Sequence, residues 1–251
     1  MDEMPTRPPG DDPRGEDRSG REAERVPVFN LPSGILYALG FLALVYFVQS
    51  VILSPASAEW LAVEFGFSPL RYVYGFSDQG LEWLWTPVTY SFLHGSLEHL
   101  GFNGLWLAAF GTPVLRRIGV ARFVALWIVS AAGGALLHAL VNWGQPTLMI
   151  GASGVISALM GAACRFAFGG RGRIVGRHAG VAVPRLTVLE SLQQRTVVVF
   201  IAFWLFGNLL FALGLPLLGE YSGAIAWDAH IGGFLVGFLG FTLFDRPRRA
   251  S

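Results

Sequence analysis

The 251-residue chain is 53% hydrophobic and only 14% charged, with a formal net charge of +1. Its mean hydropathy of +0.52 excludes an ordinary soluble domain and is typical of a protein with several membrane spans. Because the net charge is so small, the positions of the charged residues carry more information than their sum.

Residues 1–29 differ in composition from the rest of the chain. They contain eight acidic and five basic residues, many Pro and Gly, and almost no apolar run. This composition predicts disorder, and it differs from a signal peptide, which has an apolar core soon after a short basic start. We therefore expect a disordered tail over residues 1–30, a helical membrane domain over 31–245 and a short second tail over 246–251.

Six apolar segments follow the first tail, and each is a predicted transmembrane helix. They cover residues 34–53, 97–115, 121–142, 151–168, 196–218 and 225–244. Several are short for spans that cross about 30 Å of hydrocarbon. The segment between the first two, residues 54–96, is too long for a simple connector, and its aromatic residues suit a loop in the membrane interface. The sequence thus predicts an all-α membrane protein, a bundle of six transmembrane helices with a long first outer loop.

The arginine residues predict the orientation of these spans. All 18 basic residues are arginine, and 17 of them lie in the tails and in alternate loops. Under the positive-inside rule, both termini are then cytoplasmic. The expected location is the cell membrane, with the chain crossing it several times.

Polar residues occur on the second, fourth and sixth predicted spans, where they are costly unless they face one another. These residues are His99 and Asn103, Ser153, and Asp228 and His230. In the predicted topology all three spans enter from the outer side, so the polar side chains share the outer leaflet. Ser153 lies about 10 Å along the helix from the preceding outer turn, a depth that water can reach.

Small residues at helical spacing begin beside two of these polar groups. Gly154 starts such a row next to Ser153, and Gly233 and Gly237 lie one turn and two turns after His230. Rows of this kind often serve packing alone, because they let two backbones approach closely in a membrane. Here close approach would bring the imidazole within hydrogen-bonding distance of the hydroxyl, the arrangement that an activated serine nucleophile requires.

His99 and Asn103 are four residues apart and therefore share one helix face. Alone, such a pair could be an interhelical hydrogen-bond clamp. Opposite a Ser/His pair, both side chains and the Ser153 backbone N–H are candidate donors to an oxyanion. Asp228 lies about 200° around a helix from His230, so we expect a Ser–His dyad rather than a triad and an N-cap role for Asp228.

The sequences HGSLEHLGFN, GASG and AHIGGFLVG occur in this order on the second, fourth and sixth spans. At these residues the chain resembles the rhomboid intramembrane serine proteases. The resemblance covers about residues 31–245 and implies an enzyme that cleaves transmembrane helices of membrane proteins near the outer face. It also implies roles for individual residues: Ser153 as nucleophile, His230 as general base, His99 and Asn103 as oxyanion donors, and His94, Gly151, Gly154, Gly233 and Gly237 as structural residues near the site.

The chain also departs from the family pattern at three positions. The family often has Trp-Arg in the first loop, where this chain has Trp85-Thr86, and Glu-x-Arg after the second span, where it has Leu115-Arg116-Arg117. Some members place a tyrosine on the catalytic histidine four residues after the nucleophile, where this chain has Ser157.

Three other functions are alternatives to a serine protease. An inactive rhomboid-like protein would bind membrane clients without cutting them, but such proteins typically lack the serine or the histidine. A metal-dependent hydrolase could use His94, His99 and His230, although no HExxH motif is present. A transporter or channel would explain polar spans, although the sequence has no visible inverted repeat. The preferred interpretation, an intramembrane serine protease, requires no cofactor, no metal and no nucleic acid. The expected partners of the protein are membrane-protein substrates and the lipid bilayer.

Overall fold

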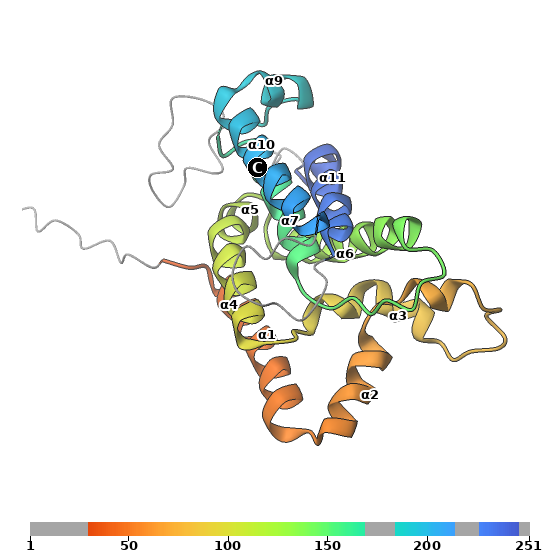
Figure 1. Cartoon of the computed structure of the whole chain (residues 1–251). Helices are drawn as coiled ribbons and strands as arrows, with labels where there is room; N and C mark the ends of the chain where they lie inside the picture. Colours follow the sequence, from red (N-terminus) through yellow and green to blue (C-terminus); the bar gives the residue numbers. More distant parts are fainter. Residues whose placement is uncertain (1–29, 169–183, 214–225, 246–251) are drawn as a thin grey trace, which may run out of the picture. The chain divides into compact units, whose positions relative to one another are not determined.

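The computed structural model describes residues 30–168, 184–213 and 226–245 (Figure 1). The predictions for the two tails, for part of the basic loop and for the loop before the last span lie outside these residues. The α-helices of the described part are α1 (Ser33–Phe47), α2 (Pro55–Phe65), α3 (Glu82–Thr89), α4 (Leu97–Trp106), α5 (Thr112–Ile118), α6 (Val120–Val141), α7 (Ser153–Ala163), α9 (Val188–Gln193), α10 (Arg195–Ala212) and α11 (Trp227–Phe244). Short 3-10 or π segments are η1 (Val48–Ile52), η2 (Pro69–Tyr72), η3 (Tyr90–Phe92) and η4 (Leu107–Gly111).

The described chain is helical, and its only β-type pairing is an isolated bridge between Phe67 and Met149. Four of its helices are long and apolar enough to cross a membrane: Ser33–Ile52, which joins α1 and η1, and α6, α10 and α11. The protein is therefore a helical membrane protein, while the count of six spans stays a prediction.

The two other predicted spans differ in form. The second is helical from Leu97 to Ile118 but is divided by the π segment η4. The fourth was predicted over 151–168, yet α7 has only 11 residues and begins at Ser153. Every α7 residue after Ser153 is buried. A helix surrounded by protein need not present the 20 apolar residues that lipid contact demands.

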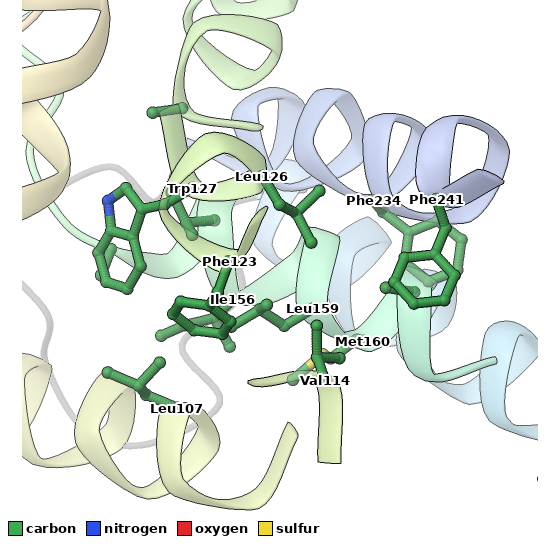
Figure 2. Packing of buried hydrophobic residues seen from close by; sticks show 14 of the residues in the cluster. Leu107, Val114, Phe123, Leu126, Trp127, Ile156, Leu159, Met160, Phe234 and Phe241 are labelled. Carbon is green, nitrogen blue, oxygen red and sulfur yellow. The ribbon is translucent and has the colours of Figure 1, made fainter. Parts of the chain in front are cut away.

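The hydrophobic core of the described residues surrounds α7. Figure 2 shows α7 side chains packing against residues of η4, α5, α6 and α11. The labelled members are Leu107, Val114, Phe123, Leu126, Trp127, Ile156, Leu159, Met160, Phe234 and Phe241. Because α7 is enclosed in this way, the position of its first residue is determined by the helices around it.

Glycines bring α11 into backbone contact with the helices on both sides of it. A Cβ atom on Gly233 would overlap the Gly154 carbonyl of α7, and one on Gly237 would overlap the Ala158 carbonyl. On the other side of α11, a Cβ atom on Gly232 would meet the Gly133 carbonyl of α6 at 2.5 Å. Larger residues at these positions would therefore push the helices apart.

The long first loop is ordered by hydrogen bonds between its helices. The Trp85 indole N–H donates to the Glu64 carbonyl at 3.0 Å, and the Thr89 hydroxyl donates to the Phe65 carbonyl at 2.7 Å. These two bonds tie α3 to the end of α2. Thr86, which stands where the family often has arginine, is fully buried.

The opposite end of α11 from His230 is held by arginines. Arg117 at the end of α5 pairs with the Asp245 carboxylate at 2.9 Å, and Arg185 approaches the same oxygen at 3.5 Å. The family's glutamate two residues before this arginine is absent here. Asp245, at the end of α11, supplies an acidic partner from a different part of the chain.

Candidate active site

Ser153 is the first residue of α7, and a sharp change of backbone direction precedes it. Gly151 has φ +122°, a conformation that residues with a Cβ rarely adopt. Its N–H donates to the Tyr90 carbonyl at 2.9 Å, and Met149 just before it forms the bridge to Phe67. The chain thus reaches α7 along a segment pinned to the first loop, which places the Ser153 side chain at the open end of a buried helix.

The start of α7 also points backbone N–H groups towards this open end. Its first ladder hydrogen bond runs from the Ile156 N–H to the Ala152 carbonyl at 2.9 Å. The N–H groups of Ser153 and Gly154 precede that bond. A helix N-terminus of this kind carries partial positive charge and favours an anion.

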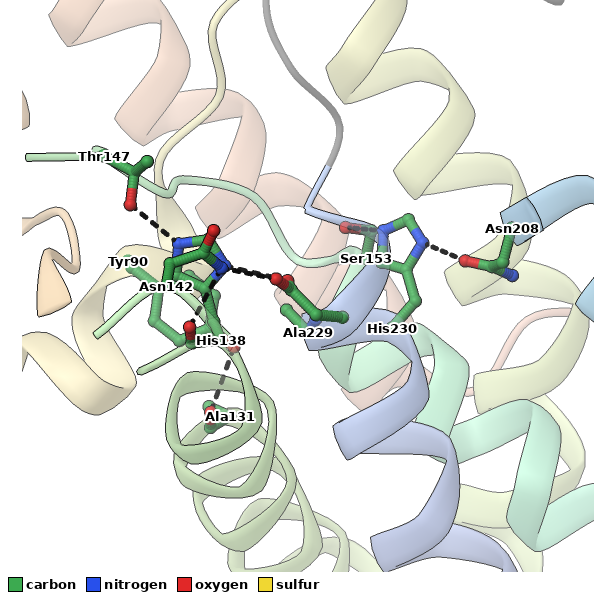
Figure 3. Close-up of polar contacts among 10 residues, drawn as sticks. Tyr90, Ala131, His138, Asn142, Thr147, Ser153, Asn208, Ala229 and His230 are labelled. Atoms are coloured by element: carbon green, nitrogen blue, oxygen red, sulfur yellow. Dashed lines mark hydrogen bonds and ion pairs between the residues drawn. The ribbon is translucent and has the colours of Figure 1, made fainter. Parts of the chain in front are cut away.

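His230 lies in the first turn of α11, beside Ser153. Its Nε2 atom is 2.8 Å from the Ser153 Oγ atom, although the two residues are 77 positions apart in the sequence (Figure 3). The contact of Gly233 with Gly154 lies one turn further along both helices. Close backbone packing therefore sets the distance between hydroxyl and imidazole.

The second nitrogen of His230 is bound by a residue that the sequence analysis did not single out. The Nδ1 atom is 2.8 Å from the Oδ1 atom of Asn208 on α10 (Figure 3). Asn208 lies on the fifth predicted span, whereas the polar residues predicted to form the site lie on the second, fourth and sixth. The available signal was a lone amide within the apolar sequence FIAFWLFGNLLFA of the fifth span.

His99 and Asn103 of α4 lie against the segment that leads into Ser153. A Cβ atom on Gly151 would be 2.7 Å from His99 Nε2 and 3.7 Å from Asn103 Nδ2. Asn103 is 4% exposed, and its Nδ2 atom has no hydrogen-bond partner within the described residues. A buried donor without a partner is costly, so this amide is suited to an acceptor that arrives with a ligand.

The predicted structural histidine, His94, is fully buried just before α4. Its ring packs edge-on against that of His99, with centroids 5.0 Å apart. Ser96 caps α4 by accepting the His99 N–H at 3.2 Å. These contacts orient the start of α4 and the His99 ring.

The predicted N-cap role of Asp228 is wrong, because Ala226 occupies the N-cap position of α11. The Asp228 carboxylate accepts hydrogen bonds from His138 Nδ1 of α6 at 2.8 Å and from Nδ2 of Asn142, the C-cap residue of α6, at 2.6 Å. It also accepts the Ala229 N–H at 2.7 Å. Asp228 is therefore a buried clamp between α11 and α6, and no hydrogen bond joins it to His230 in the described structure.

Other candidate groups are placed differently. Cys164, the C-cap residue of α7, is fully buried. In the described ranges, no group of three or more His, Cys, Asp or Glu residues is arranged to hold a metal ion. His94, His99 and His230 thus do not form such a group.

Comparison with known proteins identifies relatives of this chain. A family model for the rhomboid domain matches residues 82–246. A rhomboid protease GlpG from Serratia proteamaculans (strain 568) is 31% identical over 174 residues, which are 69% of this chain and 52% of the relative. A rhomboid protease GlpG from Yersinia pestis (strain Pestoides F) is 29% identical over 203 residues, 78% of this chain and 56% of the relative. The matched region thus spans only a little over half the length of these curated relatives.

Proposed function

Because the chain belongs to the rhomboid family, we propose that it is an intramembrane serine protease with a Ser153–His230 dyad. The observation that carries this proposal is the 2.8 Å contact between Ser153 Oγ and His230 Nε2. The two residues come from helices of a membrane bundle, and one is a nucleophile while the other is a base. The printed names of the relatives support the same activity.

Acylation begins when Ser153 Oγ attacks the carbonyl carbon of the substrate's scissile peptide. The Oγ–H bond breaks, and its proton passes to His230 Nε2. The resulting tetrahedral intermediate carries a negative oxygen. Collapse of this intermediate breaks the peptide C–N bond, and the imidazolium returns its proton to the leaving amine. Water then attacks the acyl-enzyme by the same route and frees Ser153.

The negative oxygen of the intermediate is stabilised by donors on the α4 side of Ser153. The buried Asn103 Nδ2 atom without a partner supports this role, and so does the position of His99 beside Gly151. The Ser153 N–H at the start of α7 adds a backbone donor. Donors already in place need no reorganisation when the charge develops.

The substrates are transmembrane helices of single-span or multi-span membrane proteins. Such a helix must unwind locally before attack, since its carbonyls are engaged in its own hydrogen bonds. We propose that six spans cross the cell membrane with both termini cytoplasmic, so that cleavage occurs near the outer face. The alternation of arginines along the sequence supports this orientation.

The test compares two serines on the same helix. Ser153→Ala and His230→Ala should abolish cleavage of a membrane-protein panel in proteoliposomes, and both should block labelling by a fluorophosphonate. Ser157→Ala is the matched control, because the Ser157 hydroxyl donates to the Ser153 carbonyl rather than to the imidazole. This control should still be labelled. Cleavage that survives in Ser153→Ala would refute the proposal, and a folded wild type that neither labels nor cleaves would favour an inactive client-binding protein.

A further inference from the structure

Asn208 is an unusual residue for its position in α10. Of the α10 residues only Val197 and Asn208 are buried, and the others are half-buried or exposed. A polar amide in an apolar membrane helix is costly unless its hydrogen-bonding groups have partners. Both ends of the Asn208 amide have one.

The two partners determine which way the amide faces. Nδ2 donates to the Trp204 carbonyl, one turn earlier in α10, at 2.9 Å. Oδ1 therefore faces α11, where it lies 2.8 Å from His230 Nδ1 (Figure 3). Trp204 is itself held against α11, since its ring stacks on Phe234 with centroids 4.4 Å apart.

This geometry determines the tautomer of the imidazole. A carbonyl-type oxygen can only accept, so the hydrogen of neutral His230 must be on Nδ1. Nε2 is then free of hydrogen and faces the Ser153 hydroxyl as an acceptor. This is the only neutral form in which His230 can take the serine proton.

We propose that Asn208 is a positioning residue that completes a Ser153–His230–Asn208 relay, an inference that rests on the proposed function above. When Ser153 attacks, its proton moves to Nε2, and the Nδ1–H bond to Asn208 holds the imidazolium in place. Asn208 itself neither gains nor loses a proton. The third member of the relay thus comes from α10 and not from Asp228.

Two other residues that might have held the imidazole are engaged elsewhere. Asp228 is bound by His138 of α6 and by Asn142, the C-cap residue of that helix. Ser157, at the position where some family members have a tyrosine against the histidine, donates to the Ser153 carbonyl at 2.8 Å. Asn208 is accordingly the side chain that orients Nδ1 in this chain.

The experiment distinguishes a role of Asn208 in orienting His230 from a role in helix packing alone. Asn208→Leu keeps the approximate volume and removes the acceptor. It should lower the rate of fluorophosphonate labelling by about 10–100-fold, because a misoriented base activates Ser153 poorly. kcat for a membrane substrate should fall in parallel with KM little changed, and Tm should stay close to that of the wild type. Asn208→Asp retains an oxygen at the same place and should restore most of the labelling rate.

Asn142→Leu is the matched control, since it removes a half-buried amide from the α6–α11 clamp and not from the relay. It should lower Tm while the folded protein labels at nearly the wild-type rate. The relay is refuted if Asn208→Leu is labelled as fast as the wild type. It is also refuted if Asn208→Leu and Asn142→Leu both have a lower Tm and are labelled equally slowly. In either case the proposed protease function stands. If the folded wild type neither reacts with the fluorophosphonate nor cleaves a substrate, both the proposed dyad and the proposed relay are refuted.

Discussion

The Cα atom of Gly233 lies so close to the Gly154 carbonyl that a Cβ atom on Gly233 would overlap it. Gly154 follows Ser153 directly, and Gly233 lies one turn after His230. The contact of two backbones is therefore the nearest structural constraint on the distance between the proposed nucleophile and its base.

Alanine substitutions along α11 should test this constraint. Gly233→Ala and Gly237→Ala each introduce a Cβ against a backbone carbonyl, which cannot move aside as a side chain would. Overpacking of this kind typically costs about 1–3 kcal/mol. We expect a lower Tm in detergent and slower labelling of Ser153 as the helices separate.

Gly240→Ala is the control for these variants, because a Cβ atom there has nothing within 4 Å. It should be neutral or stabilising by up to about 1 kcal/mol, since alanine favours a helix. Equal Tm values for Gly240→Ala and Gly233→Ala would contradict the close packing of α11 on α7.

Asn103→Ala should slow catalysis without unfolding the protein. The Asn103 Nδ2 atom has no partner in the described structure, so losing this donor breaks no hydrogen bond that Nδ2 makes in the resting state. Loss of one oxyanion donor typically lowers kcat by about 10²–10³-fold. Cleavage rates measure the loss of catalysis, and Tm measured on the same preparation shows whether Asn103→Ala stays folded. Full activity, or a large fall in Tm with little loss of activity, would instead assign Asn103 to a packing clamp.

Asp228→Ala should destabilise the fold strongly. It leaves the His138 and Asn142 donors facing a gap between α6 and α11, where Asp228 is 3% and His138 is 7% exposed. Leaving a buried hydrogen-bonding group without its partner typically costs about 1–3 kcal/mol. Denaturation by a graded increase of a harsh detergent measures the change.

A double-mutant cycle with His138→Leu isolates the interaction of the pair. We expect a coupling energy of about 0.5–3 kcal/mol between the two substitutions. The exposed Glu59 offers a control, and Glu59→Ala should leave the unfolding midpoint unchanged. Additive effects of Asp228→Ala and His138→Leu would show that the clamp does not hold α11.

The orientation of the chain in the membrane can be tested with two exposed glutamines, which lie on loops predicted to face opposite sides of the membrane. Gln145 follows α6 in the predicted outer turn, and Gln193 ends α9 in the predicted cytoplasmic loop. In a Cys164→Ser background, Gln145→Cys should react with an impermeant thiol reagent on intact cells. Gln193→Cys should react only after the membrane is opened. The reverse pattern would invert the topology.

Much of the site could be inferred from the sequence because its signals are local. Ser153 and His230 each stand beside glycines at helical spacing, so the sequence marks both the proposed reactive groups and the surfaces on which their helices meet. His99 and Asn103 are four residues apart, and this spacing alone places them on one face of α4. The apolar segments themselves follow from composition, since lipid demands long runs of apolar residues.

The length of α7 and the roles of Asp228 and Asn208 were decided only by the tertiary structure. Sequence periodicity says which residues share a helix face, but not which helix lies opposite that face or how much of a helix touches lipid. Enclosure by α5, α6 and α11 allows α7 to be short, and donors on α6 make Asp228 a clamp rather than an N-cap. Asn208 meets His230 because α10 packs beside the start of α11, and a pairing of residues 22 positions apart on separate helices leaves no periodic trace in the sequence.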